Sequence, residues 1–174
     1  MKSTEVYSQL RSEFSPWFKA AGFKRSKGFL SWSRPHGEAH LVVWCQISQI
    51  GWDAYSGSQF VVEFQKSKEP LVGASAIHRS RIASFLSQLE REEVRCIQNS
   101  VIAALRRPPP NYPILQIAPS VASLYLGNFR ALASPYPPAQ DIWFRYAAPE
   151  HIARWSQFIL RKLPECVSVA EAWG

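Results

Sequence analysis

Asp53, Glu63 and Gln65 are spaced so that they could belong to a site that holds a metal ion. Asp53 precedes an apolar, extended run in which Glu63 and Gln65 lie two residues apart and therefore on one face. Two carboxylates near neighbouring strand ends can hold Mg²⁺, and a lysine two residues after the second can help to generate a hydroxide. The chemistry that this pattern could support is metal-dependent hydrolysis of a phosphodiester.

The lysine of this motif is displaced by one residue. Gln65 occupies the position at which the lysine is required, and Lys66 follows it on the opposite, apolar face of the predicted strand. The predicted order of helix, three strands, helix and strand is also that of the restriction-nuclease-like core. The sequence argues against an active nuclease and leaves open a degenerate, non-catalytic relative of that fold.

Cysteine and histidine offer no stronger site. A nucleophilic Cys45, with His40 or Glu63 beside it, would need an accessible thiolate. Cys45 shares its predicted strand face with Leu41 and Val43, so we expect it to be buried and inert. No metal-ligand spacing relates the histidines, which are His36, His40, His78 and His151. We therefore expect neither a metal nor a cofactor, and the residues favour a protein that is not an enzyme.

The elements that would position these residues are three consecutive strands. Their side chains alternate between apolar and polar and include many β-branched and aromatic residues, which is typical of half-buried strands. The predicted strands cover residues 29–34, 40–48 and 59–66. The connections predict an antiparallel meander, and the loop between the second and third strands carries Trp52, Asp53 and Tyr55.

A first helix is predicted ahead of the meander. Apolar residues recur at helical spacing from Val6 to Ala21. We expect Ser3 to cap this helix, Pro16 to break and restart it, and Gly22 to end it. The apolar stripe of this helix needs a surface to pack on, and the meander offers one.

The C-terminal half is predicted to be mostly helical. Ser87 and Glu90 have the spacing of a capping box, and an amphipathic pattern follows it. Pro149 opens a last helix, which Pro164 is expected to kink or restart. We also expect a loop over residues 69–76, short helices near 82–89 and 121–126, and a fourth strand over 141–146.

The expected fold class is α+β in a single domain covering residues 1–174. Its centre is an antiparallel sheet, made of the three-strand meander plus a fourth strand. The helices are expected mainly on one face of that sheet, in the order α-βββ-α-α-(α)-β-α.

The polar face of the central strands and their loop could form a recognition surface. Aromatic side chains among a few polar groups are typical of the centres of protein interfaces. The candidate partner-binding residues are Trp44, Gln46, Ser48, Trp52, Asp53, Tyr55, Glu63 and Gln65. Alternatively, the C-terminal helices cover these side chains and the loop aromatics fold back onto the domain, and the sequence leaves both interpretations open.

The chain is basic, with 20 Lys and Arg against 13 Asp and Glu and a formal net charge of +7. A basic balance favours nucleic acid or another anionic partner, and it is equally a common way to stay soluble. The candidate anion or nucleic-acid contacts are Lys24, Arg25, Lys27, Arg34, Arg106 and Arg107, with the last two expected near the others. Their alternative role is to balance the dipoles at helix C-termini.

The cysteines and the N-terminal segment predict the compartment. The chain has 3 Cys, at positions without a paired spacing, and all lie in apolar patterns that predict buried free thiols. No apolar leader and no run of membrane-spanning length is present in this sequence. We therefore expect a cytoplasmic protein that does not enter a membrane.

Three short segments carry a resemblance to a known family. They are Gly22-Phe23-Lys24-Arg25, Trp44-Cys45-Gln46-Ile47-Ser48 and Phe60-Val61-Val62-Glu63-Phe64. Their arrangement, over roughly residues 5–70, resembles a family of bacterial domains of unknown function, number four thousand three hundred and four in that series. The resemblance implies a bacterial, cytosolic, single-domain protein and suggests an immunity or defence setting. It brings no established activity and no catalytic residues.

Together these observations favour a non-enzymatic module that binds another protein, which the sequence does not identify. Binding of nucleic acid through a basic, aromatic surface is the alternative, and a degenerate nuclease-like domain is less favoured than either.

Overall fold

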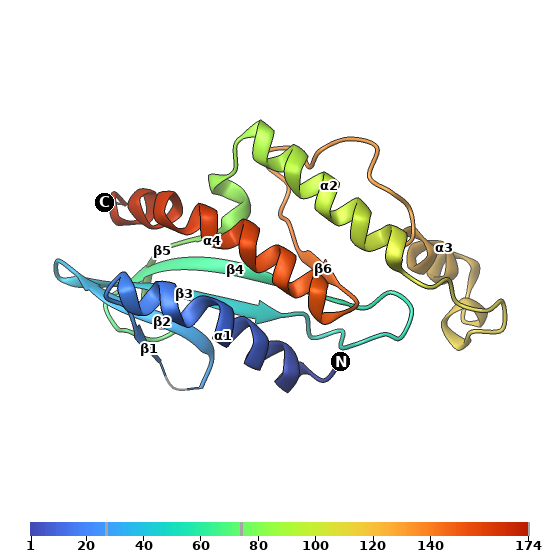
Figure 1. The fold of residues 1–174 in the computed structure, drawn as a ribbon, viewed down its shortest axis with the longest axis horizontal. Helices are drawn as coiled ribbons and strands as arrows, with labels where there is room; N and C mark the ends of the chain where they lie inside the picture. The colour runs from blue at the N-terminus through green and yellow to red at the C-terminus, as the bar shows by residue number, and fades with distance from the viewer. Residues whose placement is uncertain (27, 74, 174) are drawn as a thin grey trace.

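The computed structural model describes residues 1–26, 28–73 and 75–173. The strands are β1 (Lys24–Arg25), β2 (Leu30–His36), β3 (Ala39–Ile47), β4 (Ser58–Ser67), β5 (Ala76–Arg81) and β6 (Phe144–Tyr146). In this described part of the chain, the six strands form one antiparallel sheet in the order β1-β2-β3-β4-β5, with β6 also paired to β4 (Figure 1). The predicted meander corresponds to β2, β3 and β4.

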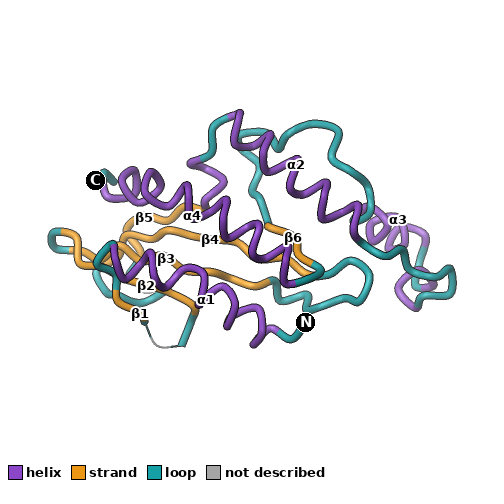
Figure 2. The backbone as a smooth tube through the Cα atoms, viewed as in Figure 1, coloured by secondary structure: helices purple, strands orange, loops and turns teal. Residues whose placement is uncertain are grey.

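Three of the four helices of the described chain gather on one face of this sheet, and the third along the chain lies beyond its end (Figure 2). The helices are α1 (Ser3–Ala20), α2 (Gln88–Ala104), α3 (Pro119–Gly127) and α4 (Pro149–Glu171), with 3-10 turns η1 (Ile82–Phe85) and η2 (Pro113–Gln116). α1 and α4 lie side by side across the sheet, and α2 contacts α4 and β6. The predicted α+β class, with helices mainly on one face, is confirmed.

The hydrophobic core lies between this helical layer and one face of the strands. Val43, Val62 and Phe64 point into it from the sheet, and Phe18 from α1 stacks on Trp32 of β2 with ring centroids 4.4 Å apart. Each fully buried side chain of this size contributes roughly 1.5–3 kcal/mol through removal of apolar surface from water. This burial fixes which face of each strand points inward.

β4 has two different partners along the same edge. Its C-terminal half pairs with β5, with Phe64 opposite Ser80, and its N-terminal end pairs with β6, with Phe60 opposite Phe144. Between the two partners, the end of β5 meets the chain that leads into β6. This junction brings together charged residues that are far apart in the sequence.

The prediction that Pro16 breaks and restarts the first helix was wrong, and the last helix does not restart at Pro164. Pro16 lies inside an uninterrupted α1 and Pro164 inside an uninterrupted α4. An internal proline costs a helix about 3 kcal/mol, but both prolines are exposed and the apolar stripe continues into the core on either side of them. Packing on the sheet therefore outweighs the local penalty. α1 also begins one residue earlier than expected, with Lys2 rather than Ser3 at the N-cap.

The expected end of α1 is confirmed. Gly22 has a φ of 79°, and its N–H donates to the carbonyl of Lys19. The N–H of Phe23 reaches back to the carbonyl of Phe18, and the two aromatic rings pack edge to face. These two bonds satisfy carbonyls that the helix end would otherwise leave without donors.

Two strands were missed and one was predicted too long. β5 and β1 are exposed and contain few apolar residues, so they lack the alternation that identifies a half-buried strand. The fourth predicted strand, 141–146, is reduced to β6, and the helix expected near 82–89 is only the η1 turn. The capping box is confirmed, because Ser87 precedes α2 and exchanges hydrogen bonds with Glu90.

Candidate functional site

The polar face of the central strands, predicted to contact a partner, is largely covered within the chain. Trp44, Glu63 and Gln65 are all buried. The amide of Gln65 donates to the carbonyl of Leu71 and accepts from the N–H of Gly73, so the β4–β5 connection lies across this face. The C-terminal helices, which the alternative interpretation placed here, lie on the opposite face.

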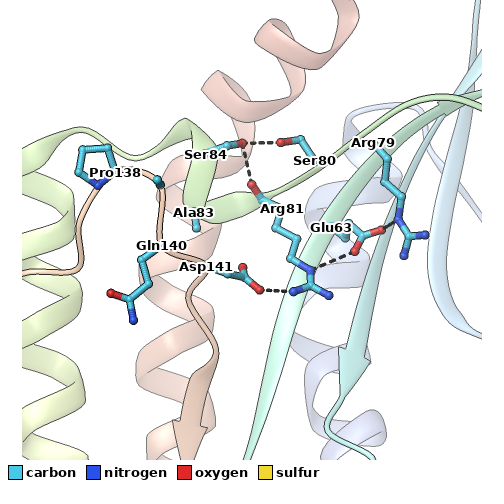
Figure 3. Close-up of a pocket in the computed structure, with 10 residues that line it drawn as sticks. Glu63, Arg79, Ser80, Arg81, Ala83, Ser84, Pro138, Gln140 and Asp141 are labelled. Carbon is cyan, nitrogen blue, oxygen red and sulfur yellow. Dashed lines mark hydrogen bonds and ion pairs between the residues drawn. The ribbon is translucent and has the colours of Figure 1, made fainter.

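Glu63 is the centre of an ion-pair network at the junction of β4, β5 and β6 (Figure 3). Its carboxylate is 2% exposed and pairs with Arg79 and Arg81 of β5, while the indole N–H of Trp44 donates to Oε1 at 3.1 Å. Arg81 also pairs with Asp141, which precedes β6. The network therefore joins three segments of the sheet edge through one buried carboxylate.

The network lines an open groove of about 600 Å³ whose charges are already matched. Two guanidinium groups face two carboxylates, so the group as a whole is neutral. Arg79 lies over the ring of Trp44 at 5.5 Å and Arg81 over that of Trp143 at 5.2 Å, which holds both cations in place. A neutral, mutually paired set stabilises the junction and supplies no free acid or base.

The residues of the nuclease-like pattern are each engaged in other contacts. Asp53 and Glu63 both accept several hydrogen bonds, Gln65 holds the β4–β5 connection, and the ammonium of Lys66 donates to the carbonyl of Trp173 on the helical side. Lys66 thus lies on the face that the alternation predicted. In the ranges that the structure covers, no three His, Cys, Asp or Glu side chains gather as a metal site.

Asp53 organises the loop between β3 and β4, residues 48–57. Its Oδ1 accepts from the backbone N–H groups of Tyr55 at 2.9 Å and Ser56 at 2.6 Å. The backbones of Asp53 and Gly57 close the loop with two further hydrogen bonds. This is the geometry of an aspartate whose side chain stabilises its own turn, as expected of Asp53 in this loop.

The same carboxylate holds a segment that lies sixty residues away in the chain. We call residues 108–130 the arm; it contains η2 and α3 and projects beyond the end of the sheet (Figure 1). The hydroxyl of Tyr125 donates to Oδ1 of Asp53 at 2.7 Å, and that of Tyr112 donates to Oδ2. Tyr55 packs edge-on against Tyr112. Asp53 and Tyr55 thus contact the arm instead of standing free.

The hydrogen bonds to Asp53 shift its acidity. Burial would raise the pKa of the Asp53 carboxyl, but the N–H of Ser56, the hydroxyls of Tyr112 and Tyr125 and the N–H of Tyr55 outweigh it and lower the pKa to about 2. The pKa of Tyr125 is raised by burial and by its bond to the carboxylate. Asp53 is therefore ionised and both tyrosines are protonated at neutral pH, which is the state that maintains these contacts.

Five of the ten large apolar side chains that are exposed among the described residues lie on the arm and the 48–57 loop. α3 has no charged residue and its apolar residues are distributed around the whole helix, a composition typical of helices buried on all sides. Yet within α3, which the structure describes throughout, only Tyr125 is buried, and Leu124 is 80% exposed. Those on the arm and the loop are Ile50 at 92%, Trp52 at 38%, Ile117, Leu124 and Leu126; the others, which lie elsewhere, are Phe29, Leu71, Ile77, Leu89 and Val169.

A cavity of about 280 Å³ lies where the 48–57 loop meets the arm. Trp52 forms part of its wall and stacks against Tyr146 with ring centroids 6.0 Å apart, so this predicted contact residue is half covered. Ser48 also lines the cavity, and its hydroxyl accepts from the N–H of Ile50. Gln46 is half-buried in β3. Arg145 of β6 completes the wall, a residue that the sequence did not single out.

The predicted anion contacts do not form one surface. Lys24 and Arg25 are exposed in β1, whereas Arg106 and Arg107 are exposed beyond the end of α2, at the opposite end of the molecule (Figure 1). Lys27 lies outside the described residues. Arg34 is used internally, because it donates to the carbonyl of Ala21, pairs with Glu171 and lies over the ring of Phe23.

The cysteines differ from the expectation at one position. Cys45 and Cys166 are buried, and burial raises the pKa of both thiols, that of Cys166 to about 12. Cys96, predicted to be buried, is exposed, because it lies on the outer face of α2 while Val94 and Ile97 point inward. The two buried thiols remain protonated and unreactive at neutral pH.

Comparison of the chain with protein-family models, with curated proteins and with solved structures finds no match. The resemblance noted from the sequence therefore stays a prediction. Within the described ranges, no helix has both the length and the apolar character needed to cross a membrane.

Proposed function

We propose that this protein is a non-enzymatic module that binds another protein, and that the arm and the 48–57 loop form its docking surface. The observation that carries the proposal is Leu124, 80% exposed on an uncharged helix of apolar residues. Groups of exposed apolar side chains mark interaction sites in many soluble proteins. The immunity or defence setting has no support beyond the family resemblance.

The surface is preorganised by polar contacts beneath it. Tyr112 and Tyr125 both donate to Asp53, and Arg145 donates to the side chain of Asn128 at the end of α3. A segment that is already ordered loses less conformational entropy when it binds. These partly buried bonds explain how an arm with so little apolar packing keeps its place against the sheet.

The charges around the surface favour an acidic partner. Between residues 94 and 140 the chain has no Asp, Glu or Lys, and its charged side chains there are all arginines. Arg106, Arg107 and Arg130 are exposed at the two ends of the arm. A partner with an apolar centre and an acidic rim would complement this distribution, whereas two copies meeting arm to arm would bring like charges together.

Nucleic-acid binding remains the second candidate, with weaker support. Its predicted contacts fall at two ends of the molecule, and Arg34 is occupied by Glu171. Aromatic side chains that could stack on bases are mostly part of the core. Mobility shift with mixed DNA and RNA at low salt addresses this candidate directly.

The test of the proposal is quantitative capture of the partner from a lysate of the source cell by immobilised protein. Leu124→Ser should reduce capture about tenfold, which is the effect of losing one well-packed apolar contact. Leu89→Ser is the matched control, because Leu89 is a helical leucine that is 84% exposed but lies on α2. Equal capture by the two variants would remove the arm from the interface.

A further inference from the structure

Arg145 has fewer hydrogen-bond acceptors than its position requires. It lies in β6 between Phe144 and Tyr146, which point into the core, so its side chain lies toward the 48–57 loop and the arm. Nη1 donates to the carbonyl of Ser56 at 2.9 Å and Nη2 to Oδ1 of Asn128 at 2.7 Å. Nε is shielded from solvent and has no acceptor among the described residues.

Arg91 shows how this fold satisfies a buried arginine that has only structural contacts. Arg91 is 2% exposed, and all three of its nitrogens donate to backbone carbonyls, among them those of Leu86 and Pro137. Nη2 has two acceptors, the carbonyls of Ala83 and Pro138. A buried guanidinium normally has an acceptor for each of its nitrogens, because each buried polar group without a hydrogen bond costs free energy. Arg145 has acceptors for only two of its three nitrogens among the described residues.

The charge of Arg145 is also uncompensated. Among the described residues, no carboxylate forms an ion pair with it, in contrast to Arg79, Arg81 and Arg34. Burial lowers the pKa of Arg145, because removing the guanidinium from water destabilises its charged form. An anion brought to the guanidinium from the cavity would compensate its charge and so recover part of the cost of that burial.

The cavity that Arg145 lines has room for a small group with an apolar part. Its volume of about 280 Å³ lies just under the range of ~300–1,000 Å³ typical of small-molecule sites, so a nucleotide would not fit. Ile50, Trp52 and Ile114 form apolar walls, and Arg145 and Asn128 form a polar one. An aliphatic group and an anionic group could therefore be held side by side.

We propose that this cavity binds the C-terminal residue of a partner protein, with the free carboxylate on Arg145 and an aliphatic side chain against Trp52 and Ile50. This rests on the proposed function, because the cavity opens among the same exposed apolar residues. A C-terminal residue carries a carboxylate and a side chain on one carbon atom, which suits so small a volume. An internal Asp or Glu would bring two further backbone connections into it.

Asp53 lines the same cavity and does not cancel this preference. Both of its carboxylate oxygens already accept hydrogen bonds. The donors that stabilise its negative charge are the hydroxyls of Tyr112 and Tyr125 and the backbone N–H groups of Tyr55 and Ser56. The guanidinium of Arg145 has no such partner. Of the two charged groups that line the cavity, Asp53 has its hydrogen-bond donors, whereas Arg145 has no carboxylate partner among the described residues.

The experiment is a titration of the whole chain followed by NMR, with the Nε–H of Arg145 and the indole N–H of Trp52 as reporters. The probes are N-acetyl-leucine, its neutral amide, and N-acetyl-Leu-Asp-amide, which carries its carboxylate on a side chain. N-acetyl-leucine should shift both reporters saturably, with affinity at least about tenfold above that of the two amides. The Nε–H of Arg91 is the internal control and should not move.

Arg145→Lys should keep part of the preference for the free carboxylate, and Arg145→Gln should lose it. If a variant fails to fold, the wild-type titration still decides. Equal shifts with the acid and its amide, or no saturable shift up to about 20 mM, would overturn the proposal. The titration uses no partner protein, so its failure leaves the docking role of the arm to be judged by the Leu124 variants.

Discussion

The hydroxyl of Tyr125 in α3 donates to Oδ1 of Asp53, in the loop between β3 and β4, over 2.7 Å. With the bond from Tyr112, it fastens the arm to the sheet through one carboxylate. The proposed docking surface therefore depends on polar contacts that lie beneath it and that a partner need not touch.

Tyr125→Phe should loosen the arm without unfolding the domain. Loss of one hydrogen bond to a charged acceptor costs about 1.5–3 kcal/mol locally, so amide hydrogen exchange over residues 112–128 should accelerate at least tenfold. Tyr55→Phe is the control, because the Tyr55 ring packs in the same cluster while its hydroxyl has no hydrogen bond among the described residues. Unchanged exchange in Tyr125→Phe would show that the arm is held by something else.

Acid should weaken the same connection. The pKa of Asp53 falls from its ordinary 3.8 to about 2 in the folded protein, so the unfolded chain binds the proton more readily between these values. The free energy of unfolding that Asp53 contributes, about 1–2 kcal/mol, is therefore complete above pH 4 and is lost as the pH falls towards 2. Denaturant unfolding of wild type and Asp53→Asn should show a stability gap that closes over this range. A constant gap would contradict the assignment.

The strand pattern predicted the sheet well and the site poorly, for one physical reason. Alternation identifies strands that turn one apolar face to the core, which is why β2, β3 and β4 were found and the exposed β5 was not, although β3 and β4 bury their polar face as well. The long-range contacts of Glu63 and Asp53 connect residues 16 to 72 positions apart, and such partners leave no periodic signal. Two features were nevertheless readable: Arg79 and Arg81 at a spacing of two, and the uncharged apolar segment between prolines that became α3.

Glu63→Gln should be strongly destabilising. It leaves the guanidinium groups of Arg79 and Arg81 without their shared buried carboxylate, and breaking such a pair costs about 3–5 kcal/mol when both partners are buried. The arginines here are partly exposed, so about 2–3 kcal/mol is expected from denaturant unfolding. Glu92→Gln, which breaks a pair with Arg95 at the surface of α2, should have a much smaller effect on the free energy of unfolding. Similar losses in both variants would show that burial of Glu63 has little effect.

Gly57 is required at the point where the 48–57 loop passes β6. Its φ is 71°, and a Cβ there would lie 2.2 Å from the carbonyl oxygen of Tyr146. Gly51 has a φ of 86°, and a Cβ added there would have no described neighbour within 4 Å. Replacing Gly51 therefore measures the cost of the backbone conformation alone, without a steric clash. Gly51→Ala should lose about 1–2 kcal/mol and Gly57→Ala clearly more, measured by thermal unfolding. Equal losses would mean that the backbone of β6 can move aside.

The most direct measurement of the docking role is site-specific photo-crosslinking in the source cell. A benzoylphenylalanine placed at Leu124 should give a crosslinked protein product, and the same group at Leu89, equally exposed on α2, should give none. Adding Tyr125→Phe to the Leu124 probe should weaken the product, because the arm is then less well fixed. Crosslinking from Leu89 but not from Leu124, or the same products from both, would contradict the assignment of the arm as the surface that binds the partner.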